Sequence, residues 1–323
     1  IDSGSSKDNE CFDAGLFVLY YRWRISAGGD DMSWRKIPFL RWSFWRMMLG
    51  MKHLTTEWQV GDGREARLAD HVVKNAREGD AADAIRVIDE FAYSESFLIN
   101  VGDEKGAILD EAVKRANPLQ VLELGTYCGY SSIRMAVAAP HAKIYSIEFN
   151  ADNADIARRI HKHAGVSDRV TVIVGTLGDG GVTADALESE YGFGPGTLDL
   201  VFLDHAKEAY LPDIQMIVER GWLRRGALAV ADNVKFPGAP EYHAYMKENE
   251  GKLWKTEEHE THVEYQSVIK DLVLVSEYLH PAMEPSRVEA QVPFPLKLQP
   301  RLTYCEVDLP DSDNDRRKQT ASR

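Results

Sequence analysis

The sequence predicts a doubly wound α/β fold, in which helices cover both faces of a mostly parallel sheet. Five short runs in the middle of the chain are apolar at almost every position, and the segments between them are long enough for a helix. Strands buried on both faces lose the polar alternation of half-exposed strands, which is typical of parallel sheets. The five expected strands are residues 119–124, 143–147, 170–174, 198–203 and 227–231.

The composition indicates a globular protein that does not bind nucleic acid. The 323 residues include 38 basic and 51 acidic side chains, for a net charge of −13, and 44% of the residues are hydrophobic. That apolar content is enough for one sizeable core. Binding to a phosphate backbone needs clustered Lys and Arg, so this charge argues against it. Cys11, Cys128 and Cys305 lie too far apart to suggest a disulfide framework, and we expect a cytoplasmic location.

Composition divides the chain into three regions. Residues 1–60 hold five of the seven tryptophans and a cluster of basic residues. Residues 61–278 alternate the strand-like runs with helical patterns. Residues 279–323 contain six of the thirteen prolines and a charged end, which predicts a largely disordered tail. The first residue is Ile1 and not methionine, so whether a segment precedes it is left open.

Residues 39–54 predict an amphipathic helix. Trp42 and Trp45 sit between or beside the basic residues that flank its apolar arc. Aromatic and basic residues around an apolar face suit peripheral contact with a membrane interface. A helix packed on the core or on an oligomer surface fits equally well. The apolar arc comprises Leu40, Phe44, Met47, Met48, Met51 and Leu54, and the basic side comprises Arg41, Arg46, Lys52 and His53.

A glycine-containing turn follows the first expected strand. Gly125 and Gly129 are four residues apart, after the acidic residue Glu123 and before a helix expected to open at Ser131. Dinucleotide-binding loops have their first two glycines two residues apart, and this loop has no Walker lysine. The pattern therefore favours a nucleoside ligand without a pyrophosphate, and S-adenosylmethionine fits that description.

Glu148 ends the second expected strand, 23 residues after Gly125. An acid at that place can accept hydrogen bonds from both hydroxyls of a ribose. The alternative is that the glycines only form a turn and Glu148 is a solvated strand end. Ser131 has two compatible interpretations, as the N-cap of the helix and as a residue that holds a ligand carboxylate.

Oxygen-bearing side chains follow the fourth and fifth expected strands. Asp204 comes directly after the fourth, and Asp232 and Asn233 come after the fifth. Neighbouring parallel strands place such residues at one edge of the sheet, where two carboxylates and an amide favour Mg²⁺ over zinc. Taken singly, these residues are more often turn formers or solvated ends. His205 is a packed imidazole or a zinc ligand, and Lys207 is a surface lysine or a base whose ammonium form a nearby dication disfavours.

These motifs resemble the catechol O-methyltransferase family over residues 62–278. The matching stretches are NVGD at 100–103, VLELGTYCGYS at 121–131, VFLDH at 201–205, ADNV at 231–234, PGAP at 237–240 and EY at 264–265. The resemblance implies a Rossmann-like methyltransferase that uses S-adenosylmethionine, Mg²⁺ and a catechol-type small-molecule substrate. It places cofactor contacts at Val101, Gly125, Tyr127, Ser131, Glu148 and His205, Mg²⁺ ligands at Asp204, Asp232 and Asn233, the general base at Lys207, and the acid that binds the second catechol hydroxyl at Glu264. From the residues alone, Glu264 is only a polar side chain beside Tyr265 on a solvated face.

The chain departs from the family around the substrate. Ala206 and Phe97 stand where the family has tryptophan, Ile99 replaces a methionine near the transferred methyl group, and Gly178 replaces a glutamine near the adenine. Pro237 still matches one wall. The catalytic set is intact, so the chemistry is expected to persist while the acceptor stays open between a catechol and another hydroxylated molecule. A non-catalytic S-adenosylmethionine-binding module tethered to a membrane or a partner is the alternative from a different class.

Overall fold

The computed structural model describes residue 37, residues 41–49 and residues 59–279. The tail predicted to be disordered lies outside the described residues except for its first position, and so does most of the tryptophan-rich region 1–60.

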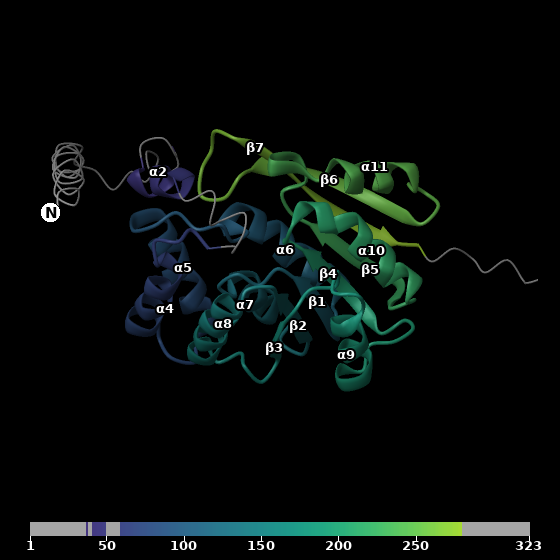
Figure 1. Cartoon of the computed structure of the whole chain (residues 1–323), viewed down its shortest axis with the longest axis horizontal. Coiled ribbons are helices and arrows are strands. Elements are labelled where there is room, and N and C mark those ends of the chain that lie inside the picture. Colours follow the sequence, from purple (N-terminus) through teal and green to yellow (C-terminus); the bar gives the residue numbers. More distant parts are fainter. Residues whose placement is uncertain (1–36, 38–40, 50–58, 280–323) are drawn as a thin grey trace, which may run out of the picture. The chain divides into compact units, whose positions relative to one another are not determined.

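One seven-stranded sheet forms the centre of the fold, with the strand order β3-β2-β1-β4-β5-β7-β6 (Figure 1). The strands β1 to β5 pair in parallel, β7 is antiparallel to β5, and β6 is antiparallel to β7. All five predicted strands are present, and the predicted doubly wound α/β class is confirmed. The strands are β1 Gln120–Leu124, β2 Lys143–Glu148, β3 Val170–Val174, β4 Leu198–Leu203, β5 Leu223–Ala231, β6 Trp254–His262 and β7 Lys270–Tyr278.

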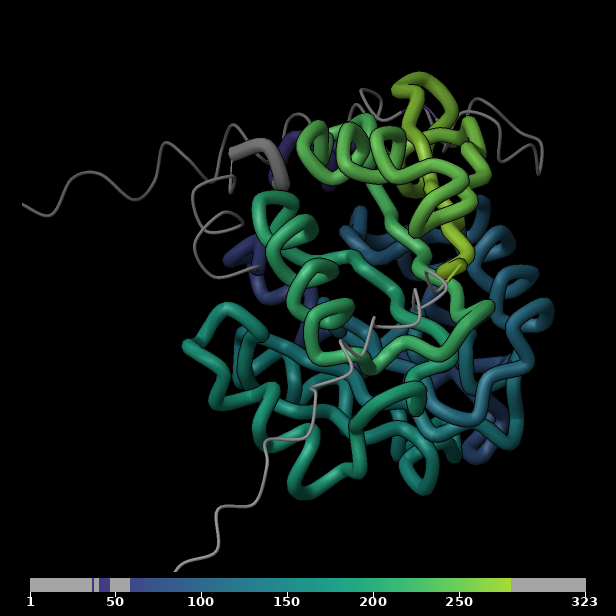
Figure 2. Tube along the Cα trace, turned by 90° about the vertical axis from the view of Figure 1, so that its right-hand side faces the viewer, coloured from purple at the N-terminus to yellow at the C-terminus, as the bar shows by residue number. Residues whose placement is uncertain are grey.

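Helices lie on both faces of the sheet. The helices α6, α7 and α8 pack on one face with α4 and α5 outside them, and α9, α10 and α11 pack on the other. Figure 2 is viewed from the side of the green helices α10 and α11, which lie in front of the blue helices of the first half of the domain. The α-helices are α2 Trp42–Leu49, α4 Arg64–Asn75, α5 Ala81–Ser94, α6 Gly102–Ala116, α7 Tyr130–Ala138, α8 Ala151–Ala164, α9 Val182–Tyr191, α10 Tyr210–Glu219 and α11 Pro240–Glu248, with the shorter turns η3 Lys207–Ala209 and η4 Val234–Gly238.

Strand β4 shows why the central strands are apolar on both faces. Leu200 and Phe202 point into the core under α4 to α8, whereas Val201 and Leu203 point into the core under α9 to α11. All four side chains are at most 1% exposed, and burial of each contributes about 1.5–3 kcal/mol to folding. With both faces covered, the polar groups of the strand are confined to its ends.

The amino-terminal helix α2 packs against the core through Phe44, and its Ser43 hydroxyl accepts from the backbone nitrogen of Phe97 at 3.2 Å. Phe44 is buried and meets the ring of Phe97 edge-on, with ring centroids 5.8 Å apart. Trp42 and Trp45 are exposed. The prediction that placed Arg41 on the outer, basic side is wrong, because Arg41 precedes the helix and its buried guanidinium donates to the backbone carbonyls of Ala92 and Tyr265.

The contact of Phe44 supports the interpretation of a helix packed on the core. The predicted helical residues Leu40, Met51, Lys52, His53 and Leu54 lie outside the described residues, as do the side chains of Met47 and Met48. Within residues 41–49 and 59–279, no helix combines the length and the apolar character that crossing a bilayer requires.

Candidate active site

Two neighbouring strand ends bring the predicted carboxylates together. Leu203 and Ala231 are paired in register at the ends of β4 and β5, so Asp204 and Asp232 are the next residues on adjacent strands. The backbone nitrogen of Asp232 also donates to the carbonyl of Leu203 at 3.0 Å. The sheet therefore fixes both carboxylates at its carboxyl edge, as the sequence predicts.

Asn233 joins this edge to the last hairpin of the sheet. Its backbone is left-handed, with φ of 52°, and its nitrogen donates to Asp232 Oδ1 at 2.7 Å. Its side-chain Nδ2 donates to Glu264 Oε1 at 2.9 Å and to Asp271 Oδ2 at 2.8 Å. Because both of these side-chain bonds use the nitrogen, the amide oxygen is the atom that Asn233 can offer to a metal.

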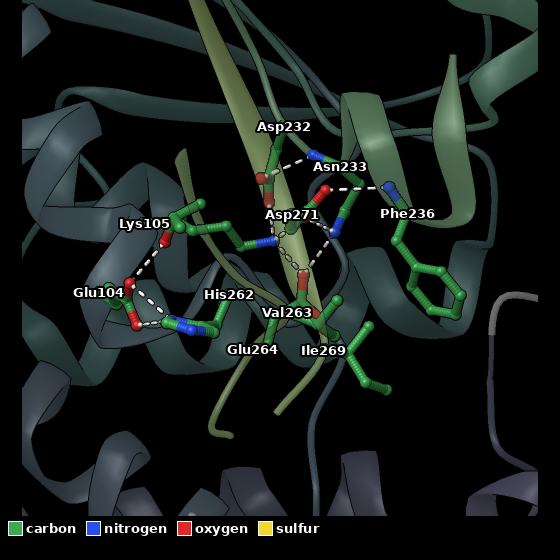
Figure 3. Close-up of polar contacts among 12 residues, drawn as sticks. Glu104, Lys105, Asp232, Asn233, Phe236, His262, Val263, Glu264, Ile269 and Asp271 are labelled. Carbon is green, nitrogen blue, oxygen red and sulfur yellow. Dashed lines mark hydrogen bonds and ion pairs between the residues drawn. The ribbon is translucent and has the colours of Figure 1, made fainter. Parts of the chain in front are cut away.

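Lys105 lies among these carboxylates, as Figure 3 shows. Its Nζ is 2.8 Å from Asp232 Oδ2, 2.5 Å from Glu264 Oε1 and 3.2 Å from Asp271 Oδ2. Burial alone would lower the pKa of Lys105, but the surrounding carboxylates outweigh it and raise that pKa above its usual value. Neither Lys105 nor Asp271 was predicted from the sequence. A lysine that is buried between a helix and a sheet is unusual.

Lys207 is held beside the strand ends by a short turn. Its Nζ is 3.2 Å from Asp204 Oδ1 and 2.7 Å from the hydroxyl of Tyr210, and its side chain is 11% exposed. The buried Tyr210 hydroxyl donates to the carbonyls of Leu203 at 2.7 Å and Asp232 at 3.0 Å. Tyr210 thus links both strand ends to Lys207, and the alternative of a surface lysine does not describe this position.

His205 is a packed imidazole, which was one of the two alternatives predicted for it. Its Nε2 is 2.8 Å from Asp213 Oδ2, and its ring stacks on Tyr210 with centroids 5.0 Å apart. Burial lowers the pKa of His205 although Asp213 opposes the shift, which favours the neutral ring. The packed position rests on the contact of Nε2 and on the ring stacking, because Nδ1 has no hydrogen-bond partner.

The donor set at the strand ends matches the ligand preferences of Mg²⁺. Within residues 41–49 and 59–279, no group of three or more His, Cys, Asp or Glu side chains is arranged to hold a metal ion. Mg²⁺ needs fewer, because it is usually bound through one or two carboxylates and keeps water or substrate oxygens. Asp232 Oδ2 is buried, makes no hydrogen bond and lies 2.8 Å from the ammonium of Lys105, so this oxygen already faces a cation. Asp204, Asp232 and Asn233 could therefore hold Mg²⁺.

The glycine loop lies directly against the strand end that carries Asp204. Gly125 has φ of 99°, and a Cβ at this position would overlap the backbone oxygen of Asp204. Gly129 has φ of 82°, and a Cβ there would overlap the imidazole of the buried His161. Tyr127 is also left-handed, with φ of 48°. Positions 125 and 129 both need glycine, because the backbone is left-handed there and no space is left for a Cβ.

Glu148 holds this loop from the neighbouring strand. It is 4% exposed, and its Oε2 accepts from the backbone nitrogens of Thr126 at 3.1 Å and Tyr127 at 2.7 Å. Its Oε1 accepts from the nitrogen of Asn150 at 2.9 Å. Burial raises its pKa. The alternative of a solvated strand end is therefore wrong, because the carboxylate is buried and fixed by three backbone donors.

Ser131 does not cap the helix, so that part of its interpretation is wrong. Helix α7 begins at Tyr130 with Gly129 as its N-cap residue, and Ser131 instead donates to the buried carboxyl group of Glu123. Ser146 donates to the other oxygen of the same carboxyl group. Burial raises the pKa of Glu123 to about 7. From the sequence, Glu123 was interpreted only as an acid before the glycine. An acid inside an apolar strand is itself a signal of a functional position.

The remaining predicted residues lie around this edge. Val101 is buried at the start of α6, and Glu264 is 8% exposed in the connection between β6 and β7. Phe97 is 2% exposed, and its ring is 6.4 Å from that of Tyr265 between centroids. Phe236 by contrast is 48% exposed, and its backbone nitrogen donates to Asp271 Oδ1 at 3.0 Å. The backbone of Phe236 is therefore fixed to the carboxylate cluster, and its ring is exposed.

The chain is similar to known O-methyltransferases in sequence and in fold. The sequence model of a family described as O-methyltransferase matches residues 82–258. A probable O-methyltransferase of Mycobacterium tuberculosis is 58% identical over 233 residues, covering 72% of this chain and 100% of that protein. Catechol O-methyltransferase of Bos taurus is 35% identical over 259 residues, covering 80% of this chain and 90% of that protein. An O-methyltransferase structure from Streptomyces achromogenes shares the fold, with a TM-score of 0.50 and 21% identity over 63% of this chain and 92% of that one.

Proposed function

The chain belongs to the O-methyltransferase family, and we propose that it transfers the methyl group of S-adenosylmethionine to one hydroxyl of a vicinal diphenol chelated by Mg²⁺. The observation that carries the proposal is the meeting of Asp204, Asp232, Asn233 and Lys207 at two strand ends, in contact with the glycine loop. The bovine relative's name supports the acceptor class, since it is a catechol O-methyltransferase.

The glycine loop and Glu148 are the parts that would hold the cofactor. Oε2 of the Glu148 carboxylate already accepts from two backbone nitrogens, whereas Oε1 accepts from one, so Oε1 is the oxygen that would accept from a ribose hydroxyl. Ser131 lies in the first turn of α7 and donates to Glu123 of β1, and the resemblance places a cofactor contact at Ser131. The closeness of Gly125 to Asp204 would set the sulfonium next to the acceptor site.

The chemistry assigns separate tasks to the side chains at the strand ends. When bound by Asp204, Asp232 and Asn233, Mg²⁺ would supply charge that lowers the pKa of a chelated phenol. Lys207 Nζ would accept the proton of the attacking oxygen, and Glu264 would accept a hydrogen bond from the second hydroxyl. Holding oxygen, methyl carbon and sulfur in line can supply ~7 kcal/mol or more of the acceleration.

We expect Phe236 to form part of the acceptor pocket in place of the tryptophans that this family otherwise has. Its ring is exposed, its backbone nitrogen donates to Asp271, and the next residue is Pro237, the wall residue that the resemblance retains. Phe236→Ala should raise KM for a diphenol about fivefold and leave kcat nearly unchanged, because loss of one aromatic contact weakens binding by ~1 kcal/mol. Initial-rate kinetics measure both constants.

Val182→Ala is the matched control for that substitution, because Val182 is also an exposed apolar residue but lies at the start of α9. It should leave both constants unchanged. An unaltered KM in Phe236→Ala would show that the ring does not contact the acceptor.

A labelled-methyl assay tests the proposed function. The protein is incubated with S-adenosylmethionine and a panel of vicinal diphenols, their monomethyl ethers and simple phenols, with Mg²⁺ or with a chelator. Turnover should require both adjacent hydroxyls and should fall to background in the chelator, since a monomethyl ether lacks the second chelating hydroxyl. Equal turnover of simple phenols, or turnover that persists in the chelator, would contradict the proposal and favour another hydroxylated acceptor.

A further inference from the structure

Lys105 connects three parts of the site through one ammonium group. It lies in the second turn of α6, and its side chain is 1% exposed. Its Nζ reaches Asp232 at the end of β5, Glu264 after β6 and Asp271 in β7, as Figure 3 shows. No task in the proposed reaction requires a second lysine at this place, so its position calls for a separate explanation.

The charges of the site explain why a cation is needed there. Four carboxylates, Asp204, Asp232, Glu264 and Asp271, are buried or nearly so at this edge. The ammonium of Lys207 is paired with Asp204, which leaves three carboxylates that converge on Lys105. Like charges this close repel each other strongly when they are shielded from water. The arrangement therefore depends on a positive charge at its centre.

We propose that Lys105 is a tethered counter-cation of this acidic cluster, which holds Asp232, Glu264 and Asp271 together when no divalent ion is bound and weakens the binding of one. The second part rests on the proposed function, because it names Asp232 as a ligand of Mg²⁺. The ammonium is an ion-pair partner of Asp232 Oδ2, the oxygen that has no hydrogen bond. A divalent ion at that oxygen would be close to the ammonium, and the repulsion between the two cations lowers the affinity for the ion.

Lys105→Met tests the proposal because methionine keeps a long apolar stem but removes the charge. In a chelator, the variant should unfold at a temperature lower by about 10 °C, since removing one partner from a buried ion network leaves uncompensated charge. Added Mg²⁺ should restore most of that loss, while it changes the melting temperature of the unaltered protein much less. Calorimetry should give a Kd for Mg²⁺ at least about tenfold lower in the variant.

Lys114→Met is the matched control. Lys114 lies on the same helix, but its side chain is 56% exposed and pairs with Glu111 at the surface. This variant should match the unaltered protein in melting temperature and in affinity for Mg²⁺, because exposed ion pairs contribute little. A tighter Kd confined to Lys105→Met is also a result that a purely structural role of Lys105 would not produce.

Two outcomes would overturn the proposal. One is a melting temperature of Lys105→Met in the chelator equal to that of the unaltered protein. The other is a loss of stability, or a failure to fold, that Mg²⁺ does not reverse. The melting temperature in the chelator tests the role of Lys105 without any metal. A failure of the proposed function would appear separately, as an unaltered protein that binds no Mg²⁺.

Discussion

Lys207→Met is expected to lower kcat for methyl transfer by about 10²–10⁴-fold and to leave cofactor affinity unchanged, because it removes the group that accepts the proton of the attacking oxygen. The Nζ of Lys207 is held by the carboxylate of Asp204 and by the hydroxyl of Tyr210, whereas the glycine loop is held by Glu148. Single-turnover transfer of a labelled methyl group gives the rate of the chemical step, and calorimetry gives the affinity for S-adenosylmethionine.

Lys207→Arg separates the base from the charge in that experiment. An arginine can keep an ion pair with Asp204, but its guanidinium stays protonated and cannot accept the proton. If Lys207 acts as the base, Lys207→Arg should be about as slow as Lys207→Met. A Lys207→Arg protein that retains most of kcat would show that only the positive charge matters, and a Lys207→Met protein with unaltered kcat would exclude both roles.

The parts of the site that the sequence predicted are those that depend on local position along a strand. Asp204 and Asp232 each follow an apolar run, and parallel strands in register bring the residues after such runs to one edge. Glu148 follows the same rule, as the last residue of the strand beside β1. For these residues, recognising the strands was enough to place the side chains.

The residues that the sequence did not predict depend on contacts between distant segments. Lys105 and Asp271 are 166 positions apart in the sequence, and only the packing of α6 beside β7 makes them neighbours. A lysine in an amphipathic helix is usually solvated, and nothing in its neighbourhood in the sequence shows that it turns inward. The position predicted for Arg41 was wrong because a helical projection does not apply to a residue that precedes the helix.

The two antiparallel strands were missed for different reasons. Strand β6 lies at the edge of the sheet, and its sequence WKTEEHETH carries mostly polar side chains, so an apolar run cannot reveal it. Strand β7 contains the apolar run 272–275, which did resemble the other buried strands. Asp271 directly precedes that run, so the sequence contained a signal for a polar residue at the edge of a buried strand.

Gly125→Ala is expected to reduce both stability and cofactor binding by a large amount. The added Cβ would overlap the backbone carbon and oxygen of Asp204, which cannot rotate away as a side chain would, and an alanine would be strained at φ of 99°. Together these effects should lower the free energy of unfolding by about 3 kcal/mol. Because relief of the overlap requires β4 and the loop to separate, the affinity for S-adenosylhomocysteine should fall with it.

Gly194→Ala is the matched control, because Gly194 lies in the loop before β4 with no left-handed φ and no atom within 4 Å of an added Cβ. Its unfolding free energy should stay within about 0.5 kcal/mol of the unaltered value. Urea unfolding and calorimetric titration with S-adenosylhomocysteine measure the two quantities in both variants. If Gly125→Ala kept the original affinity for S-adenosylhomocysteine, the cofactor site would not require the close approach of the loop to the Asp204 strand end. The proposed placement of the sulfonium next to Asp204 would then be contradicted.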